Sequence, residues 1–168
     1  GGEFHRDVAE AAAIAGQRID APLLAIILGR SPLEVMRRLY LLEQRHGLVT
    51  TYEGDASSGG FAFANTKIRE VLYEQMPAPL RRESHLRVGE ALEQQCAGQE
   101  EERIYDLAHH FVRAQHAEKG YRYALRAAER AEAHYALAEA IAYLDDALSM
   151  RSLAAGEPGA QAPERIIE

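Results

Sequence analysis

The sequence predicts a mainly α-helical protein with one small β-hairpin, on three observations. Helix-capping residues and glycines enclose apolar segments in the first 47 residues. A β-branched and aromatic segment, a Gly/Ser-rich segment and an alternating Phe-Ala segment follow between residues 48 and 64. Beyond residue 65 the chain is rich in alanine, with short connections between helical segments. We therefore expect three helices, a two-stranded β-hairpin and then an antiparallel α-helical segment.

The first three helices are predicted from their ends. The alanine-rich segment 7–15 favours a short helix. Asp20 can cap a second helix, whose nearly continuous apolar residues predict burial, and Gly29 ends it. Ser31 caps a third helix that has a proline at its first position and a glutamate three residues after the cap, as in a capping box. Gly47 is the C-terminal stop of this helix.

A β-hairpin is predicted between residues 48 and 64. The segment 48–53 is β-branched and aromatic, which is typical of a strand. The segment 54–60 contains three glycines and two serines and predicts a turn. The alternating segment 61–64 can pair back as the second strand. Three helices followed by a two-stranded hairpin is the element order of a winged-helix domain, predicted here for residues 5–76.

The rest of the chain is predicted to be helical. Asn65 or Thr66 caps a helix that runs to about residue 75. The next helix carries Leu80, His85, Val88, Ala91 and Leu92 broadly on one face. Because the connections are short, neighbouring helices should pack antiparallel. The helices after residue 76 are expected up to residue 96 and over residues 101–115, 118–133 and 135–153.

The last two of these helices contain a repeat signal. Small or apolar residues recur at the same spacing in both helices, which allows one helix to pack closely on the next. This pattern resembles a tetratricopeptide unit, so we interpret residues 77–153 as a tetratricopeptide-like segment. We interpret residues 154–168 as a linker with the start of a truncated further helix, and residues 1–4 as an expression scar. The recurring residues are Gly120, Ala124 and Ala127, then Ala140, Leu144 and Ala147.

Composition limits the classes of function. The chain has 168 residues and a formal net charge of -7, and acidic residues exceed basic ones on both sides of residue 66. This balance disfavours nucleic acid and anionic membranes as partners. The only cysteine, Cys96, cannot form an internal disulfide, and the longest apolar run is far shorter than a membrane helix. These features favour a cytoplasmic protein.

The most specific segment is Phe61-Ala-Phe-Ala-Asn-Thr-Lys-Ile-Arg-Glu-Val-Leu-Tyr-Glu-Gln-Met-Pro77, which joins the hairpin to the helical half. A helix bearing Arg81, Arg82 and His85 follows it. This order resembles the winged-helix and tetratricopeptide-like region of STAND-type signalling ATPases, which occur in large LuxR-type transcriptional regulators and in multidomain kinases and cyclases. The resemblance implies a regulatory fragment that contacts its own ATPase core and a protein partner.

The resemblance also implies that ATP or ADP binds outside this fragment. The chain has no Gly-x-x-x-x-Gly-Lys-Ser/Thr motif, so ATP or ADP is expected in an upstream domain and no cofactor in this fragment. In these families a histidine after the second strand of the hairpin often approaches the nucleotide phosphates. Asn65 stands at the matching position, and it cannot supply the charge of a histidine.

Two further groups of residues are candidate sites. Arg37, Arg38 and Arg45 on the third helix could contact DNA or the ATPase core. His109 and His110 are adjacent and should point to different sides of a helix, and no histidine pair has the i, i+4 spacing, so no metal site is expected. No nucleophile–base pair is evident, so we do not expect an enzyme.

We expect a domain junction at the hairpin and the helix that follows it, because a relay requires mechanical continuity. The predicted function is thus a non-catalytic regulatory and protein-interaction fragment of a larger signal-transducing ATPase. The alternative is a sequence-specific DNA-binding winged-helix regulator with a helical dimerisation arm. The predicted junction residues are Phe61, Phe63, Ile68, Val71, Leu72 and Tyr73.

Overall fold

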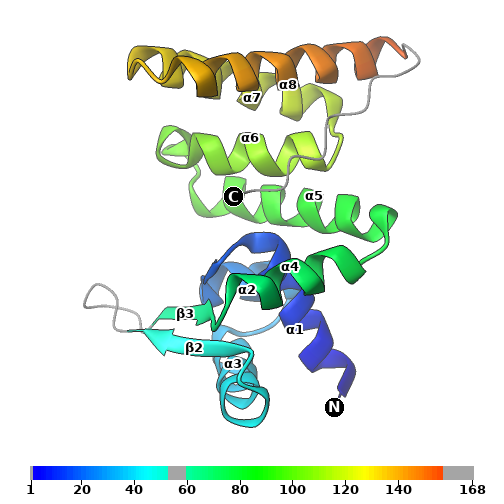
Figure 1. Cartoon of the computed structure of the whole chain (residues 1–168), viewed down its shortest axis with the longest axis vertical. Coiled ribbons are helices and arrows are strands. Elements are labelled where there is room, and N and C mark those ends of the chain that lie inside the picture. The colour runs from blue at the N-terminus through cyan, green and yellow to red at the C-terminus, as the bar shows by residue number, and fades with distance from the viewer. Residues whose placement is uncertain (1, 53–59, 157–168) are drawn as a thin grey trace. The chain divides into compact units, whose positions relative to one another are not determined.

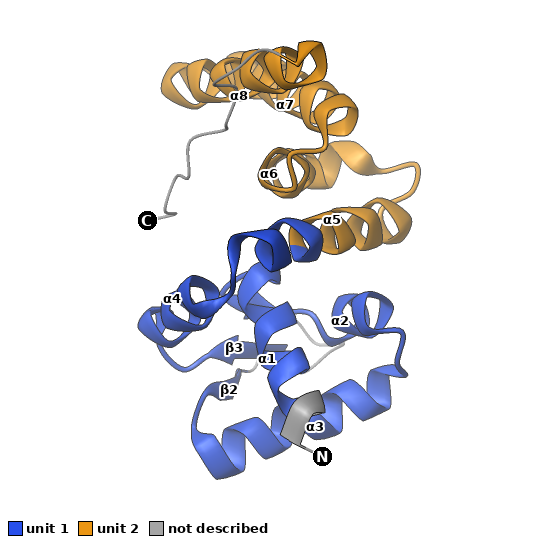
Figure 2. Ribbon diagram, turned by 90° about the vertical axis from the view of Figure 1, so that its right-hand side faces the viewer, with its two compact units in different colours: residues 1–84 blue, residues 85–168 orange. Residues whose placement is uncertain are grey.

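The computed structural model describes residues 2–52 and 60–156, with side chains from residue 5 onward. The described chain is mainly helical, with a small three-stranded antiparallel sheet (Figure 1). It divides into two compact units, residues 1–84 and 85–168 (Figure 2). The division falls inside one helix, α5 (Ala78–Gln95). The domain boundaries expected at residues 76 and 153 stay predictions.

Unit 1 contains four helices before α5, and local signals define most of their ends. In α2 (Ala21–Leu28), Asp20 accepts a hydrogen bond from the Leu23 amide, and Gly29 ends the helix with φ 61°. In α3 (Pro32–His46), Ser31 forms both hydrogen bonds of a capping box with Glu34. These ends agree with the sequence prediction. The other two helices are α1 (Gly2–Ala15), which begins five residues earlier than predicted, and α4 (Thr66–Gln75).

The sheet has three strands, so the prediction of a two-stranded hairpin was incomplete. β2 (Val49–Tyr52) pairs with β3 (Gly60–Phe63) as expected. β1 (Arg18–Ile19) pairs with the other edge of β3, so the strand order is β1-β3-β2 and all pairs are antiparallel. A two-residue strand is too short to show alternation in the sequence, so only its partner reveals it. Most of the predicted turn lies outside the described residues.

The core of unit 1 combines the helices and one face of the sheet. On β3, Phe61 and Phe63 point inward and are 1% and 3% exposed, whereas Ala62 between them is half-buried. Tyr40 from α3 meets the Phe61 ring edge-to-face, with centroids 5.0 Å apart. This cluster holds α1, α2 and α3 on the sheet. Its other fully or nearly buried members include Val8, Ala12, Ile19, Leu24, Val35, Leu39, Leu42 and Val49.

Unit 2 is helical, and one predicted helix is divided. The segment expected as a helix over residues 101–115 begins as the 3-10 helix η1 (Glu100–Arg103) and continues as α6 (Ile104–Arg113). α7 (Ala117–Ala133) packs on α6, and α8 (Leu137–Ala155) packs on α7. α8 runs two residues further than predicted. Residues 154 and 155 of the predicted 154–168 linker are therefore helical, and the segment 157–168, with the further helix, lies outside the described residues.

Small residues bring α7 and α8 close together in unit 2. Gly120 and Ala124 of α7 are buried, as are Ala140 and Ala147 of α8. A Cβ atom added to Gly120 would lie only 2.9 Å from two atoms of Met150, so the glycine is required by close helix packing. Among the described helices, none has the length and apolar character needed to cross a membrane.

Candidate functional site

The arginines of α3 are placed differently from one another. Arg37 and Arg45 are exposed, whereas Arg38 is half-buried, with its Nη1 atom 2.9 Å from Nε2 of His5. Burial and the Arg38 charge lower the pKa of His5, which favours a neutral imidazole that accepts this hydrogen bond. The same helix carries Glu43, whose Oε1 accepts from the Thr51 amide at 2.7 Å. Helix α3 thus carries charges of both signs.

Asn65 has a structural task in α4. Its backbone is extended, and its Oδ1 accepts a hydrogen bond from the Lys67 amide at 2.7 Å, as an N-cap does. The side chain is exposed. The short polar side chain at this position is therefore explained by the start of the helix.

The predicted junction residues have several environments in unit 1. Phe61 and Phe63 lie in its core, and Ile68 and Leu72 of α4 pack against the same cluster half-buried. Val71 is 41% exposed. Tyr73 is half-buried, and the Arg81 guanidinium lies 5.2 Å from the centre of its ring. These contacts anchor α4 to the sheet and helices of unit 1; a role as a junction stays a prediction.

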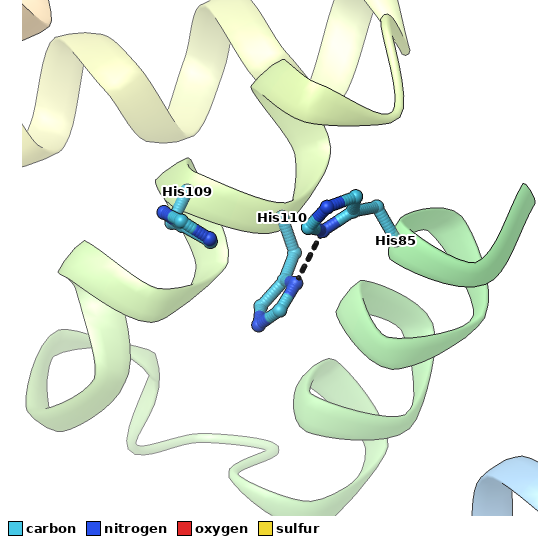
Figure 3. A group of neighbouring side chains, drawn as sticks. All are labelled: His85, His109 and His110. Carbon is cyan, nitrogen blue, oxygen red and sulfur yellow. Dashed lines mark hydrogen bonds between the residues drawn. The ribbon is translucent and has the colours of Figure 1, made fainter. Parts of the chain in front are cut away.

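Three histidines of unit 2 lie together (Figure 3). His85 comes from α5, and His109 and His110 come from α6. The Nδ1 atoms of His85 and His110 are 2.9 Å apart, and both side chains are almost fully buried, at 2% and 3% exposed. His109 is half-buried, and its ring centre lies 5.7 Å from that of His85 and 4.9 Å from that of His110. One nitrogen from each ring lies within 4.8 Å of the others.

Sequence reasoning missed this cluster for two reasons. A helical i, i+4 test cannot detect a ligand on another helix, and His85 is 25 residues before His110. Adjacent helical residues are separated by about 100° around the axis, which still allows long side chains to converge. One sequence signal could have indicated the cluster: His85 is a polar residue on the same helix face as Val88 and Leu92, which are buried.

A second polar cluster surrounds Glu93 of α5. Its carboxylate accepts hydrogen bonds from Lys119 Nζ at 2.6 Å and from the Tyr123 hydroxyl at 2.5 Å. Burial alone would raise the pKa of Glu93, but these hydrogen bonds and the charges of Lys119 and Arg122 lower it below its usual range. Burial and the hydrogen bond to Glu93 raise the pKa of Tyr123 to about 12. The cluster therefore ties α5 to α7 through a carboxylate that stays ionised.

The outer face of α8 carries a row of exposed apolar side chains. Leu137, Ile141, Leu144 and Leu148 are 63%, 61%, 45% and 59% exposed. Their spacing of four, three and four residues places them in one stripe along the helix. Tyr135, just before the helix, is 89% exposed. An exposed apolar stripe of this kind is a candidate contact surface.

An open groove of about 500 Å³ lies on unit 2. Within it, Arg126 donates to Glu101, and Arg130 lies over the Tyr105 ring. The groove is open and lined by charged side chains, unlike the enclosed and mostly apolar pockets that bind small ligands. Its lining residues are Glu101, Glu102, Arg126, Glu129, Arg130 and His134.

Searches with this chain find no matching family model, curated protein or solved structure.

Proposed function

We propose that the chain is a non-catalytic regulatory and protein-interaction fragment of a larger signal-transducing ATPase. It relays the binding of a partner or ligand to a nucleotide-binding core in the same protein. The observation that carries this proposal is the exposed apolar row on α8, Leu137, Ile141, Leu144 and Leu148. A solvent-exposed face of this kind is suited to an amphipathic helix of a protein partner.

The finer architecture belongs to the same proposal. Unit 1 is a winged-helix domain, with α1, α2 and α3 before a β2–β3 hairpin. The order β1-β3-β2, with a short first strand beside the hairpin, supports this assignment. Unit 2 is tetratricopeptide-like, supported by the close contact of α7 with α8 through buried small residues.

The contacts of Asn65 support the proposal that this chain itself does not bind nucleotide. Its amide oxygen is engaged by the Lys67 amide, so the side chain serves the helix start. Together with the missing phosphate-binding motif, this leads us to expect no ATP or ADP binding by the isolated chain. Isothermal calorimetry tests the point: stoichiometric binding in the micromolar range would contradict it.

The apolar row is tested in the full-length protein with Ile141→Glu combined with Leu148→Glu. Both positions are exposed, so the isolated chain should keep the wild-type circular dichroism spectrum and unfolding midpoint. In the full-length protein we expect a several-fold change in the regulated rate of ATP hydrolysis. Glu139→Gln, an exposed change on the same helix, is the control. An unchanged rate in the double variant, or a full-length protein without ATP hydrolysis, would refute the proposal.

A second candidate, sequence-specific DNA binding, is favoured by the exposure of Arg37 and Arg45 on α3. A mobility-shift assay at physiological salt distinguishes the two. The relay proposal expects weak binding that is insensitive to sequence. Nanomolar, sequence-selective binding that is lost in an Arg37→Ala, Arg45→Ala variant and kept in Arg151→Ala would establish the second candidate instead.

A further inference from the structure

We propose that His85, His109 and His110 form a binding site for one divalent transition-metal ion of the zinc, nickel or copper class. The ion would join α5 to α6 within unit 2. This inference goes beyond the proposed function and does not depend on it, because it rests on three side chains of one compact unit.

The separations of the ring nitrogens are close to those that a metal requires. A zinc ion binds imidazole nitrogen at about 2.0–2.1 Å, so two nitrogens of a tetrahedral site lie about 3.3–3.4 Å apart. The His85 and His110 Nδ1 atoms are 2.9 Å apart, and all three donors lie within 4.8 Å of one another. Small rotations of the rings, chiefly of the half-buried His109, are therefore enough to form three metal bonds.

The hydrogen bond between His85 and His110 supports the same inference. Two Nδ1 atoms at 2.9 Å can share only one proton, so one ring donates and the other accepts. Figure 3 shows this contact as a dashed line between the two rings. The lone pair of the acceptor ring therefore points at the nitrogen of its neighbour. A metal ion takes the place of the shared proton, which moves to Nε2 of its own ring, so that both rings bind through Nδ1 as neutral imidazoles. Binding should therefore weaken as the pH falls and protons compete for the rings.

The donor set selects the class of metal. Three imidazoles suit zinc, nickel, cobalt and copper, whereas magnesium and calcium require oxygen ligands. The fourth position of a tetrahedral zinc site would be taken by water. The charge of unit 2 also favours a cation, because residues 85–168 contain 15 acidic and 9 basic residues, a net charge of -6.

Binding would have a mechanical consequence. His85 is in the first helix of unit 2, and the other two ligands are in the next helix. An ion bound only by the folded arrangement stabilises it over the unfolded chain. The metal would thus reinforce the α5–α6 pair and raise the unfolding midpoint of unit 2.

The test is isothermal calorimetry of the metal-free chain with ZnCl₂. We expect one equivalent to bind and MgCl₂ to give no binding heat. His109→Gln should weaken zinc binding by ~10–100-fold or more, by comparison with the loss typical of a changed metal-site residue. The matched control is His134→Gln, an exposed histidine of unit 2 that lies beside the carboxylates of the open groove. This variant should bind zinc as the wild type does.

His109 is the chosen position because it is half-buried, so its replacement should leave the circular dichroism spectrum unchanged. Two further measurements do not depend on that outcome. Zinc should raise the unfolding midpoint of the wild type, and Co²⁺ should give the intense visible absorption of a tetrahedral site. Equal zinc affinity in the wild type and His109→Gln, or loss of binding in His134→Gln alone, would overturn the proposal.

Discussion

The two units are stabilised in different ways. Unit 1 has a core of large apolar side chains, with Phe61 and Phe63 of the sheet facing three helices. Unit 2 also buries large apolar side chains, such as Phe111 and Leu107. It differs in bringing helices close together through Gly120 and in placing polar groups such as His85 and Glu93 between them. Both units should therefore respond to the removal of side-chain volume, and unit 2 should respond in addition to added volume, to protonation and to metal ions.

The largest effect is expected from truncation in unit 1. Phe63→Ala removes a ring that is 3% exposed and should lower the free energy of unfolding by ~3–5 kcal/mol. The loss of stability should come from the ring alone, because the backbone amide of residue 63 donates to the Gln17 carbonyl at 3.1 Å and alanine retains that amide. Chemical denaturation measures the change. Leu33→Ala, at a position 57% exposed, is the control and should cost less than ~0.5 kcal/mol.

The same variant tests the relay. If the two units unfold in one transition that moves as a whole in Phe63→Ala, they are mechanically coupled, as a relay requires. Calorimetry that shows two transitions, with only that of unit 1 shifted, would remove the physical basis of the relay.

In unit 2, adding side-chain volume at a close helix contact should lower the free energy of unfolding. Gly120→Val places new carbon atoms against the buried Met150 side chain and should cost ~1–3 kcal/mol. A double-mutant cycle identifies the cause. Met150→Ala makes room, so the double variant should be more stable than the sum of the two single changes predicts. Additive losses would mean that the helix contact is not the source of the effect.

Acid should weaken unit 2 through Glu93. The lowered pKa of this carboxyl means that the unfolded chain binds its proton more tightly, so Glu93 contributes stability at neutral pH. That contribution is present above the usual glutamate pKa of about 4.3 and is lost as the pH falls below it. Glu93→Gln should lower the stability at pH 7 and reduce the loss of stability on acidification below the usual glutamate pKa of about 4.3. An unchanged slope in this variant would contradict the proposed linkage.

Local signals explain how much of the fold could be predicted. The ends of α2 and α3 follow from residues within one helical turn, Asp20 and Gly29 for one and Ser31 with Glu34 for the other. β1 was missed because its two residues pair with Phe61 and Ala62, more than 40 positions away. The predicted 101–115 helix was wrong in its first turn, where residues 100–103 adopt the tighter 3-10 geometry.

The candidate functional residues show the same difference between local signals and contacts that are distant in sequence. Alternation predicted a strand that contains Phe61 and Phe63, and both side chains lie in the core of unit 1. Their role at a domain junction stays a prediction. The histidine cluster depends on how α5 and α6 face each other, which no spacing within one helix records. The exposed row on α8 could not be predicted either. Leucine and isoleucine at helical spacing are usually buried, and only the position of the neighbouring helix shows that these side chains are exposed.

The smallest expected change in the free energy of unfolding comes from removing the N-cap side chains, which differ between the two units. In unit 1, Ser31 accepts a hydrogen bond from the Glu34 amide at 3.3 Å, and its own amide donates to the Glu34 carboxylate at 3.0 Å. In unit 2, the N-cap of α7 is His116, whose Nδ1 accepts from the Lys119 amide at 3.3 Å. Ser31→Ala should cost ~1 kcal/mol, as removal of a serine cap usually does.

His116→Ala should cost less than Ser31→Ala, because the serine cap is one half of a reciprocal pair of hydrogen bonds and the histidine cap is a single one. Denaturation of both variants under the same conditions measures the difference. Thr50→Ala, an exposed position outside both helix starts, is the control. If His116→Ala is the more damaging variant, the imidazole must contribute through packing on Phe111, whose ring centre is 6.0 Å away, and unit 2 would then depend on its aromatic contacts more than on its helix ends.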